Sequence, residues 1–467
     1  MLNTPHWQKA GASPSPWTAG DKWRPLQLIV DDIELPPSPA LELLGSFAGH
    51  RNPLEFVSPG SGVGGGIQFT GENETMYRFA EQAPFITGNP TGWWRRAAAE
   101  QAAGFEDLDV SVLERRLHLL DEACRDWIDG LVMPFDPALR ERWKRLILRG
   151  PLYTAEEAAA LSGLFLRATG ERVVEIEPPG VAIMVSEERL YLLGATSLLT
   201  NYEFVWEGSG RSSASGDPTL RSLIEAVAVR LGRALKARDY LNVRRRATSV
   251  EEIWSDVLYF FESVLVCLQG AADAAARLLR VIFQLRGPRG MANWGRQDWW
   301  TALGASEAPC DEFDRDCLED IDVLIGELRN SIHGEVLTSE LRERVEPVDM
   351  PSMMGFPRRP VALGSELATV VLPAAVRRGG SARWAIHQIS TNGPALIDPW
   401  QYAEAAIATT GEALSSVLSA LARTPDFSEL ADDPDVRALH LGRVVQRENA
   451  RLLFGVENLP APSRRLA

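Results

Sequence analysis

This chain contains few cysteines, and it has fewer basic than acidic residues. Only four of the 467 residues are cysteine, and no two of them form a Cys-x-x-Cys pair. This excludes a disulfide-stapled miniprotein and gives no support to a zinc site of common ligand spacing. Asp and Glu number 63 and Lys and Arg number 48, which gives a net charge of −15. A protein that coats nucleic acid with its whole surface is therefore excluded, whereas a local basic groove is not.

The chain also lacks an apolar run of the length that a bilayer requires. Its most apolar stretch, residues 257–268, has twelve residues and contains Glu262. A spanning helix needs about 20 apolar residues. The first residues, MLNTPHWQKAG, include no apolar segment of signal-peptide length. We therefore expect a cytoplasmic protein with reduced thiols and no membrane segment.

Several catalytic and cofactor motifs are missing as well. The sequence has no Gly-x-Ser-x-Gly, no His-Glu-x-x-His and no Gly-Lys-Ser/Thr. A Gly-x-Gly-x-x-Gly match at Gly60, Gly62 and Gly65 leads into residues 67–70, which have a strand pattern. A dinucleotide site needs a helix at that place, so that the pyrophosphate meets its N-terminus. We expect no cofactor.

An acidic run at residues 311–327 holds eight carboxylates, and Asp316 and Asp320 share one face of the predicted helix. Divalent cations prefer oxygen ligands of this kind. However, the apolar stripe of the same helix lies elsewhere, which indicates a solvated face. We expect no metal ion.

The chain predicts a mainly helical α+β protein with a mixed N-terminal region at residues 1–216. Thr154 and Glu157 have the spacing of a capping box and predict a helix from residue 155 onward. A small antiparallel meander is predicted from four strands, at residues 172–177, 181–185, 190–193 and 202–206. Residues 208–216 are rich in Gly and Ser and indicate a flexible linker. We place the domain boundary there and expect the N-terminal region to bind a protein partner.

The second half of the sequence predicts a helical bundle at residues 217–425. Asp217-Pro218 is a helix start, and an apolar stripe follows at helical spacing. A further helix is predicted in the segment that ends near residue 285. Two more are predicted, at residues 313–333 and from Asp398-Pro399 onward. Strand candidates at 367–372 and 383–389 form an insertion at residues 361–390. Residues 426–467 are predicted to be a helical tail.

Between residues 274 and 297 the chain carries five arginines and no acid, next to Trp294, Trp299 and Trp300. Arginine beside exposed aromatic rings can hold a phosphate backbone while bases stack. The same arginines can offset the dipole of a helix C-terminus, followed by a loop with buried tryptophans. The sequence favours this second interpretation. The candidate substrate-binding residues are Arg277, Arg280, Arg286 and Arg289.

The most informative segment is Glu327-Leu328-Arg329-Asn330-Ser331-Ile332-His333-Gly334, at the end of the helix predicted at 313–333. It resembles the Arg-Asn…His-Gly signature of the HEPN superfamily, small helical bundles found in bacterial toxins, abortive-infection proteins and other RNA-cleaving defence factors. Arg329 and His333 enclose one residue fewer than the family usually has. Four helical positions turn about 400°, so the two side chains lie about 40° apart on one face. They can converge on one phosphate.

The resemblance implies a metal-independent endoribonuclease or RNA-binding protein of a bacterial stress or phage-defence system. His333 would move protons, Arg329 would stabilise the charge on phosphorus, and Asn330 would orient one of them. Members of the superfamily commonly pair their bundles, which implies a homodimer. Two alternatives stay open: a scaffold whose bundle mediates oligomerisation, and a bundle that binds nucleotide without cleaving it. Arg, His and Gly are also the residues that end an inert helix.

Overall fold

The computed structural model describes residues 18–19, 22–23, 26–30, 36–48, 54–59, 66–70, 77–79, 129–132, 152–177, 181–211, 218–247, 254–330, 361–388, 395–425, 427–428 and 445–459. The chain divides into two compact units: Met1–Met184 with Leu452–Ala467, and Val185–Arg451. The division therefore falls at residues 184/185, before the Gly- and Ser-rich segment at which the sequence predicts it. The mainly helical α+β class is confirmed.

The first unit contains a six-stranded mixed sheet in the order β6-β5-β4-β3-β7-β8. Its strands are β3 (Leu26–Val30), β4 (Leu54–Pro59), β5 (Gly66–Thr70), β6 (Tyr77–Phe79), β7 (Gly130–Val132) and β8 (Leu152–Tyr153). β3 pairs in parallel with both β4 and β7, and β7 pairs in parallel with β8. A short ribbon of β1 (Thr18–Ala19) and β2 (Lys22–Trp23) is separate. The strand pattern at residues 67–70 corresponds to β5, but the sequence predicts none of these pairings, because parallel pairing joins distant segments that carry no common local signal.

Helix α6 (Ala155–Thr169) packs against α2 (Pro39–Ala48) and contacts β3, β7 and β8. The predicted capping box is present: the Thr154 hydroxyl accepts from the Glu157 amide, and the Glu157 carboxylate accepts from the Thr154 amide. A helix at residues 445–454 ends against α6, where Arg167 donates to the carbonyl of Leu453 at 2.9 Å. This contact holds Leu453 to the first unit.

Two of the four predicted meander strands are wrong. β9 (Val173–Glu177) and β10 (Val181–Met184) form an antiparallel hairpin as predicted. Residues 190–193 and 202–206, in contrast, lie in the helices α7 (Glu187–Ser197) and α8 (Tyr202–Arg211). The Ser186 hydroxyl caps α7 by accepting from the Arg189 amide, so a local helix-start signal determines this segment. Residues 208–211 of the predicted linker belong to α8, and residues 212–216 lie outside the described part.

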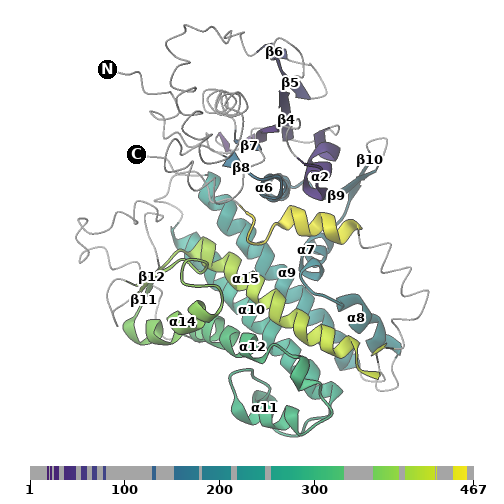
Figure 1. The fold of residues 1–467 in the computed structure, drawn as a ribbon, viewed down its shortest axis with the longest axis vertical. Coiled ribbons are helices and arrows are strands. Elements are labelled where there is room, and N and C mark those ends of the chain that lie inside the picture. Colours follow the sequence, from purple (N-terminus) through teal and green to yellow (C-terminus); the bar gives the residue numbers. More distant parts are fainter. Residues whose placement is uncertain are drawn as a thin grey trace. The chain divides into compact units, whose positions relative to one another are not determined.

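The second unit is built around three long helices: α9 (Pro218–Ala247), α10 (Trp254–Ile282) and α15 (Pro399–Ala422). They run side by side in Figure 1, and α10 contacts both of the others. The predicted stripe of α9 is buried at Leu220, Ile224, Val227, Leu231 and Leu235. The Asp398 carboxylate caps α15 as predicted, by accepting from the amide of Trp400 at 3.0 Å. The helical-bundle prediction for this region is confirmed.

The shorter elements of this unit follow α10. They are η2 (Arg289–Met291), α11 (Gln297–Gly304), η3 (Cys310–Glu312), α12 (Arg315–Ile321), the π-helical segment η4 (Asp322–Glu327) and α14 (Ser365–Arg377). A three-stranded sheet has the order β11-β13-β12, from Val361–Leu363, Ala395–Ile397 and Ile386–Gln388. Residues 367–372, predicted as a strand, lie in α14, because a short apolar run fits either structure.

Two helices, α10 over Asp256–Ile282 and α15 over Pro399–Ala422, are long and apolar enough to cross a membrane by length and composition. Half of the apolar window of α10 and 72% of that of α15 are buried inside the protein. Core helices of a bundle have this property, so it is weak evidence for a membrane span.

Candidate functional site

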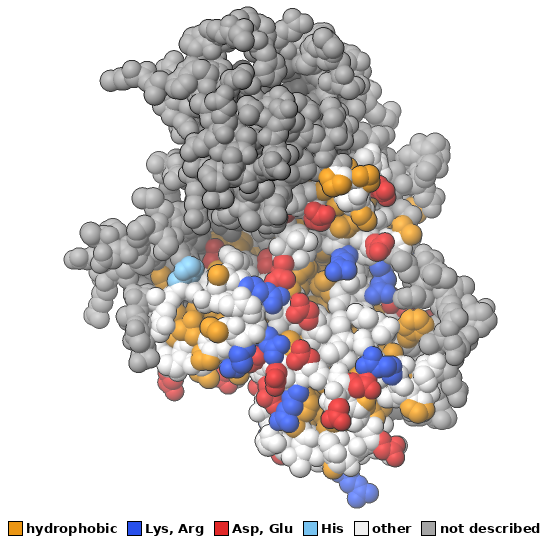
Figure 2. Space-filling model, in the orientation of Figure 1, with side chains coloured by type: hydrophobic (Ala, Val, Ile, Leu, Met, Phe, Trp, Pro, Cys, Tyr) orange, Lys and Arg blue, Asp and Glu red, His pale blue; other side chains and the backbone are white. Residues whose placement is uncertain are grey.

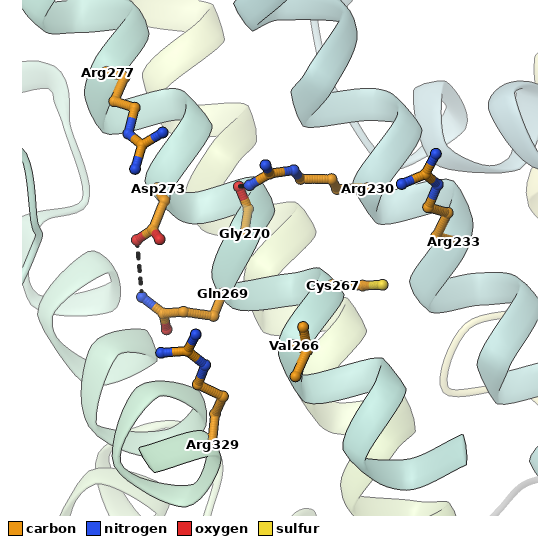
Figure 3. A pocket seen from close by; sticks show the side chains of 9 residues that line it. All are labelled: Arg230, Arg233, Val266, Cys267, Gln269, Gly270, Asp273, Arg277 and Arg329. Atoms are coloured by element: carbon orange, nitrogen blue, oxygen red, sulfur yellow. Dashed lines mark hydrogen bonds between the residues drawn. The ribbon is translucent and has the colours of Figure 1, made fainter. Parts of the chain in front are cut away.

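A cleft of about 390 Å³ lies between α9, α10 and the last described turn of the helix that follows η4. Figure 3 shows the side chains that line it. They are Arg230, Arg233, Val266, Cys267, Gln269, Gly270, Asp273, Arg277 and Arg329. Four of these side chains are cationic and one is a carboxylate. The cleft therefore favours an anionic ligand, although the chain as a whole is acidic.

The arginines of the cleft differ in how firmly they are held. Arg230 on α9 donates to the carbonyl of Gly270 on α10. A Cβ atom at Gly270 would lie 2.6 Å from the Arg230 Nη1 atom, so glycine leaves the space for this contact. Arg233 and Arg277 are exposed. Arg230 therefore joins the two helices, and Arg233 and Arg277 reach solvent at the rim.

The position of Arg329 depends on the π-helical segment η4. A π-helix bonds each residue to the fifth along the chain, so the residues after it are shifted relative to a regular α-helix. The Tyr402 hydroxyl, from α15, donates to the carbonyl of Leu324 inside η4 at 2.6 Å. Leu328 remains buried, and its neighbour Arg329 lines the cleft. Segments of this kind often occur at functional sites.

Gln269 connects the cleft to a polar cluster beside η4. Its amide nitrogen donates to Asp273 at 3.1 Å and to Asp322 at 3.4 Å. Asp322 also accepts from the side chain of Asn293 at 3.1 Å. Burial raises the pKa of the Asp322 carboxyl, and the two amide donors act in the opposite direction.

The acidic face predicted at residues 311–327 is solvated only in part. Asp316 is exposed, as expected. Asp320 is only 3% exposed and accepts hydrogen bonds from Arg377 and Arg378 of the α14 segment. Asp322 faces Gln269, as described above. Tertiary contacts supply partners for these two carboxylates that the helix by itself lacks.

Of the motif residues, Arg329 and Asn330 lie within the described part, whereas His333 and Gly334 lie outside it. Arg329 lines the cleft, and its Nη1 atom is 3.4 Å from the side-chain oxygen of the exposed Asn330. The Nε atom of Arg329 is buried and has no hydrogen-bond partner. The structure thus places one predicted catalytic residue in a cationic cleft.

The four predicted substrate-binding arginines separate in the structure. Arg277 lines the cleft beside Arg329. Arg280 instead donates to the carbonyls of Leu285 and Gly287, and so closes the C-terminal end of α10. Arg286 is exposed and does not line the cleft. Arg289 begins η2, and its side chain lies outside the described part.

The tryptophans beside these arginines are buried, as the favoured interpretation predicts. Trp294, Trp299 and Trp300 are 1%, 0% and 5% exposed. The Trp294 indole donates to the carbonyl of Ala272, and the Trp300 indole donates to the carbonyl of Trp294. They form core structure beside α10. The other interpretation, in which exposed rings stack with bases, is therefore wrong for these tryptophans.

Sequence reasoning missed the cleft residues on α9 and in the middle of α10. Arg230 and Arg233 are spaced three apart on a predicted helix, a pattern that places two cations on one face. Nothing local relates them to Gln269 or Arg329. Cys267, in the middle of α10, is partly buried and free, and burial raises the pKa of its thiol. Among the described residues, no group of three or more His, Cys, Asp and Glu side chains is arranged to hold a metal ion.

Comparison with protein-family models, curated proteins and solved structures finds no match to any of them. The geometry of the cleft and the residues of the Arg329 motif are therefore the basis for the functional argument.

Proposed function

We propose that this protein binds RNA in the arginine-lined cleft and cleaves it without a metal ion, with Arg329 and His333 as the reacting pair. The observation that carries the proposal is the place of Arg329. It comes from the Arg-Asn…His-Gly motif, and it lines the same cleft as Arg277, Arg230 and Arg233. A guanidinium group is always charged and matches the geometry of phosphate oxygens.

The proposed reaction is a transesterification within one ribonucleotide. The 2′-oxygen bonds to phosphorus, and the bond between phosphorus and the 5′-oxygen breaks. The 2′-hydroxyl loses a proton and the 5′-oxygen gains one, which leaves a cyclic phosphate and a 5′-hydroxyl. Histidine can carry out such transfers near neutral pH, so this role falls to His333. Arg329 would stabilise the added negative charge on phosphorus, and Asn330 would orient it.

The charge distribution supports local binding. On the face of the molecule in Figure 2, Lys and Arg side chains alternate with Asp and Glu side chains. The described residues on that face form no extended basic surface. With a net charge of −15, RNA binding must depend on few phosphate contacts and weaken as salt increases.

The biological setting follows from the resemblance to the HEPN superfamily. We propose a cytoplasmic factor of a bacterial stress or phage-defence system that acts as a homodimer. Two copies would bring two motifs to one substrate. The region before residue 217 would bind a protein partner that controls the activity.

A cleavage assay in EDTA tests the reaction. Purified full-length protein is incubated with mixed single-stranded RNA, and the wild type is compared with Arg329→Ala and His333→Ala. We expect each substitution to reduce cleavage by at least about 100-fold, the scale of losing one general acid-base group. His387→Ala is the matched control, because His387 lies on β12 and does not line the cleft. Cleavage that persists in both Arg329→Ala and His333→Ala would overturn the proposed mechanism.

The exposed apolar side chains of α9 and α10 favour a second candidate, a scaffold that oligomerises through the bundle. Val229 and Tyr240 on α9 and Tyr259 and Val266 on α10 are 40%, 44%, 64% and 45% exposed. Exposed apolar groups on neighbouring helices are typical of a protein interface. Sedimentation of the wild type and Tyr259→Lys tests this candidate. A dimer that dissociates in the variant, together with no RNA binding by the wild type, would favour the scaffold.

A further inference from the structure

Gln269 lies in the middle of α10 and is only 7% exposed. Its amide nitrogen donates to the carboxylates of Asp273 and Asp322, at 3.1 and 3.4 Å. Ionised carboxylates only accept hydrogen bonds, so they determine which end of the amide faces them. The amide oxygen must therefore point away from both carboxylates.

That oxygen, Oε1, is buried and has no hydrogen-bond partner. In Figure 3 it points toward the guanidinium group of Arg329. The Nε atom of Arg329 is also buried and also lacks a partner. Buried polar groups without a hydrogen bond are rare in folded proteins, and a bound ligand or water is a common explanation. The cleft thus holds one unused acceptor and one unused donor.

A ligand that satisfies both groups must offer a donor next to an anionic acceptor. RNA has this arrangement in its backbone, because the 2′-hydroxyl lies on the carbon adjacent to the one that carries the 3′-phosphate. DNA has the phosphate without the hydroxyl. The amino groups of the bases are several bonds farther from the phosphate, so they fit this pair of groups less well.

We infer that Gln269 is a specificity-determining residue that accepts a hydrogen bond from the ribose 2′-hydroxyl while Arg329 binds the adjacent phosphate. This inference rests on the proposed RNA binding. The guanidinium of Arg329 ends a flexible side chain, so it can turn from Gln269 to the phosphate and leave room for the hydroxyl. Recognition of this kind separates RNA from DNA and is independent of base sequence.

Gly326 of η4 gives a second way to reach the same oxygen. A Cβ atom at Gly326 would lie 3.1 Å from Oε1 of Gln269. Gly326→Ala would therefore crowd this oxygen, and also the Oδ1 atom of Asp322 at 3.3 Å, without removing the amide group. Gly304 of α11 is a matched control, because a Cβ atom there would have no neighbour within 4 Å.

The test is an equilibrium binding titration, by fluorescence anisotropy, with full-length protein in EDTA. The His333→Ala background prevents cleavage. Three probes of one base sequence are compared: single-stranded RNA, the same strand as DNA, and RNA with 2′-O-methyl groups. We expect RNA to bind about tenfold more tightly than the other two, the scale of one hydrogen bond to a charged or buried partner.

In the same background, Gln269→Met and Gly326→Ala should bind RNA about as weakly as DNA. The affinity for DNA and the salt dependence should stay as in the parent, because the phosphate contacts are retained. Gly304→Ala should keep the preference for RNA. Circular dichroism establishes that each variant is folded.

The outcomes separate the two proposals. If no nucleic acid binds, the proposed function fails and this inference fails with it. If RNA, DNA and 2′-O-methyl RNA bind equally well to the parent protein, RNA binding stands and the role of Gln269 is overturned. A folded Gln269→Met variant that keeps the preference for RNA would overturn it as well.

Discussion

Tyr402 donates its hydroxyl hydrogen to the carbonyl oxygen of Leu324, 78 residues earlier in the chain, over 2.6 Å. Tyr402 is fully buried in α15, and Leu324 is fully buried inside the π-helical segment η4. Where the hydrogen-bond ladder changes from the α-helical to the π-helical pattern, a carbonyl oxygen can lose its regular backbone donor, and a side-chain donor can replace it. This one contact connects the core of the bundle to the segment that sets the direction of Arg329.

Replacing Tyr402 with Phe should destabilise the protein and also weaken the binding of RNA in the cleft. The ring can keep its place, whereas the carbonyl of Leu324 loses its buried donor. We expect a loss of about 1–2 kcal/mol in the free energy of unfolding. Urea denaturation measures this loss. Tyr259→Phe is the control, because Tyr259 is 64% exposed. Equal stability of Tyr402→Phe and the wild type would show that η4 does not depend on this bond.

The buried carboxyl of Asp322 predicts a definite pH dependence. Burial raises its pKa from the ordinary value of 3.8 in the folded state. Folded protein therefore takes up this proton before unfolded protein does, and this group adds stability as the pH falls through its folded pKa. At neutral pH the buried carboxylate lowers the free energy of unfolding, and Asp322→Asn removes this destabilising charge.

The Asp322→Asn variant should therefore gain stability relative to the wild type at pH 7 and lose that advantage toward about pH 4. Urea denaturation over this range measures the difference. Asp316→Asn, which removes an exposed carboxyl of α12, is the control. An advantage of Asp322→Asn that grows on acidification would contradict the assignment.

Arg238 is predicted to be indispensable to the core of the second unit. It is 0% exposed and forms ion pairs with Asp239 at 2.8 Å and Glu404 at 3.3 Å. Arg238→Met would leave both carboxylates buried without the cation that they share. We expect a loss of about 3–5 kcal/mol, measured by urea denaturation.

Two further variants test the cause of that loss. Asp239→Asn and Glu404→Gln, combined with Arg238→Met, should recover part of the stability, because they remove the buried charge. Lys236→Met is the control on the same helix, since its ion pair with Glu187 is partly exposed and should contribute at most about 1 kcal/mol. A mild effect of Arg238→Met by itself would refute the prediction.

Replacing Gly163 of α6 even with alanine should disturb the packing around it. A Cβ atom there would lie 2.1 Å from the carbonyl oxygen of Leu453, which is a backbone atom and cannot swing aside. Gly163→Ala should therefore displace the helix at residues 445–454, at a cost of about 1–3 kcal/mol. Faster proteolysis near residue 453 is the direct readout. Gly45→Ala in α2 has no neighbour within 4 Å and should leave the cleavage rate unchanged.

Local signals account for the elements that were predicted well. Thr154 and Glu157 form the predicted capping box, and Asp398 caps α15, because both patterns act within one helical turn. The segments at 190–193, 202–206 and 367–372 were predicted as strands and are helical, because four to six apolar residues fit both periods. The start of α7 at Ser186 carries a capping signal that favours helix over strand.

The candidate site was predictable only in its parts. The motif singled out Arg329, and the acid-free stretch singled out Arg277. Arg230 and Gln269 carry no local mark, and they reach the cleft because α9 and α10 pack together along their length. The interpretation of Arg280 as a helix-ending residue is confirmed by its bonds to the chain after α10.

The sequence by itself determined the mainly helical class, the long helices of the bundle and the location of an arginine motif at a helix end. Periodic burial and capping decide these features within a few residues. The tertiary structure decided the parallel sheet pairs, the π-helical segment under Tyr402 and the meeting of four arginines with Gln269. Each of these depends on contacts between residues far apart in the chain, which form only when the helices and strands pack.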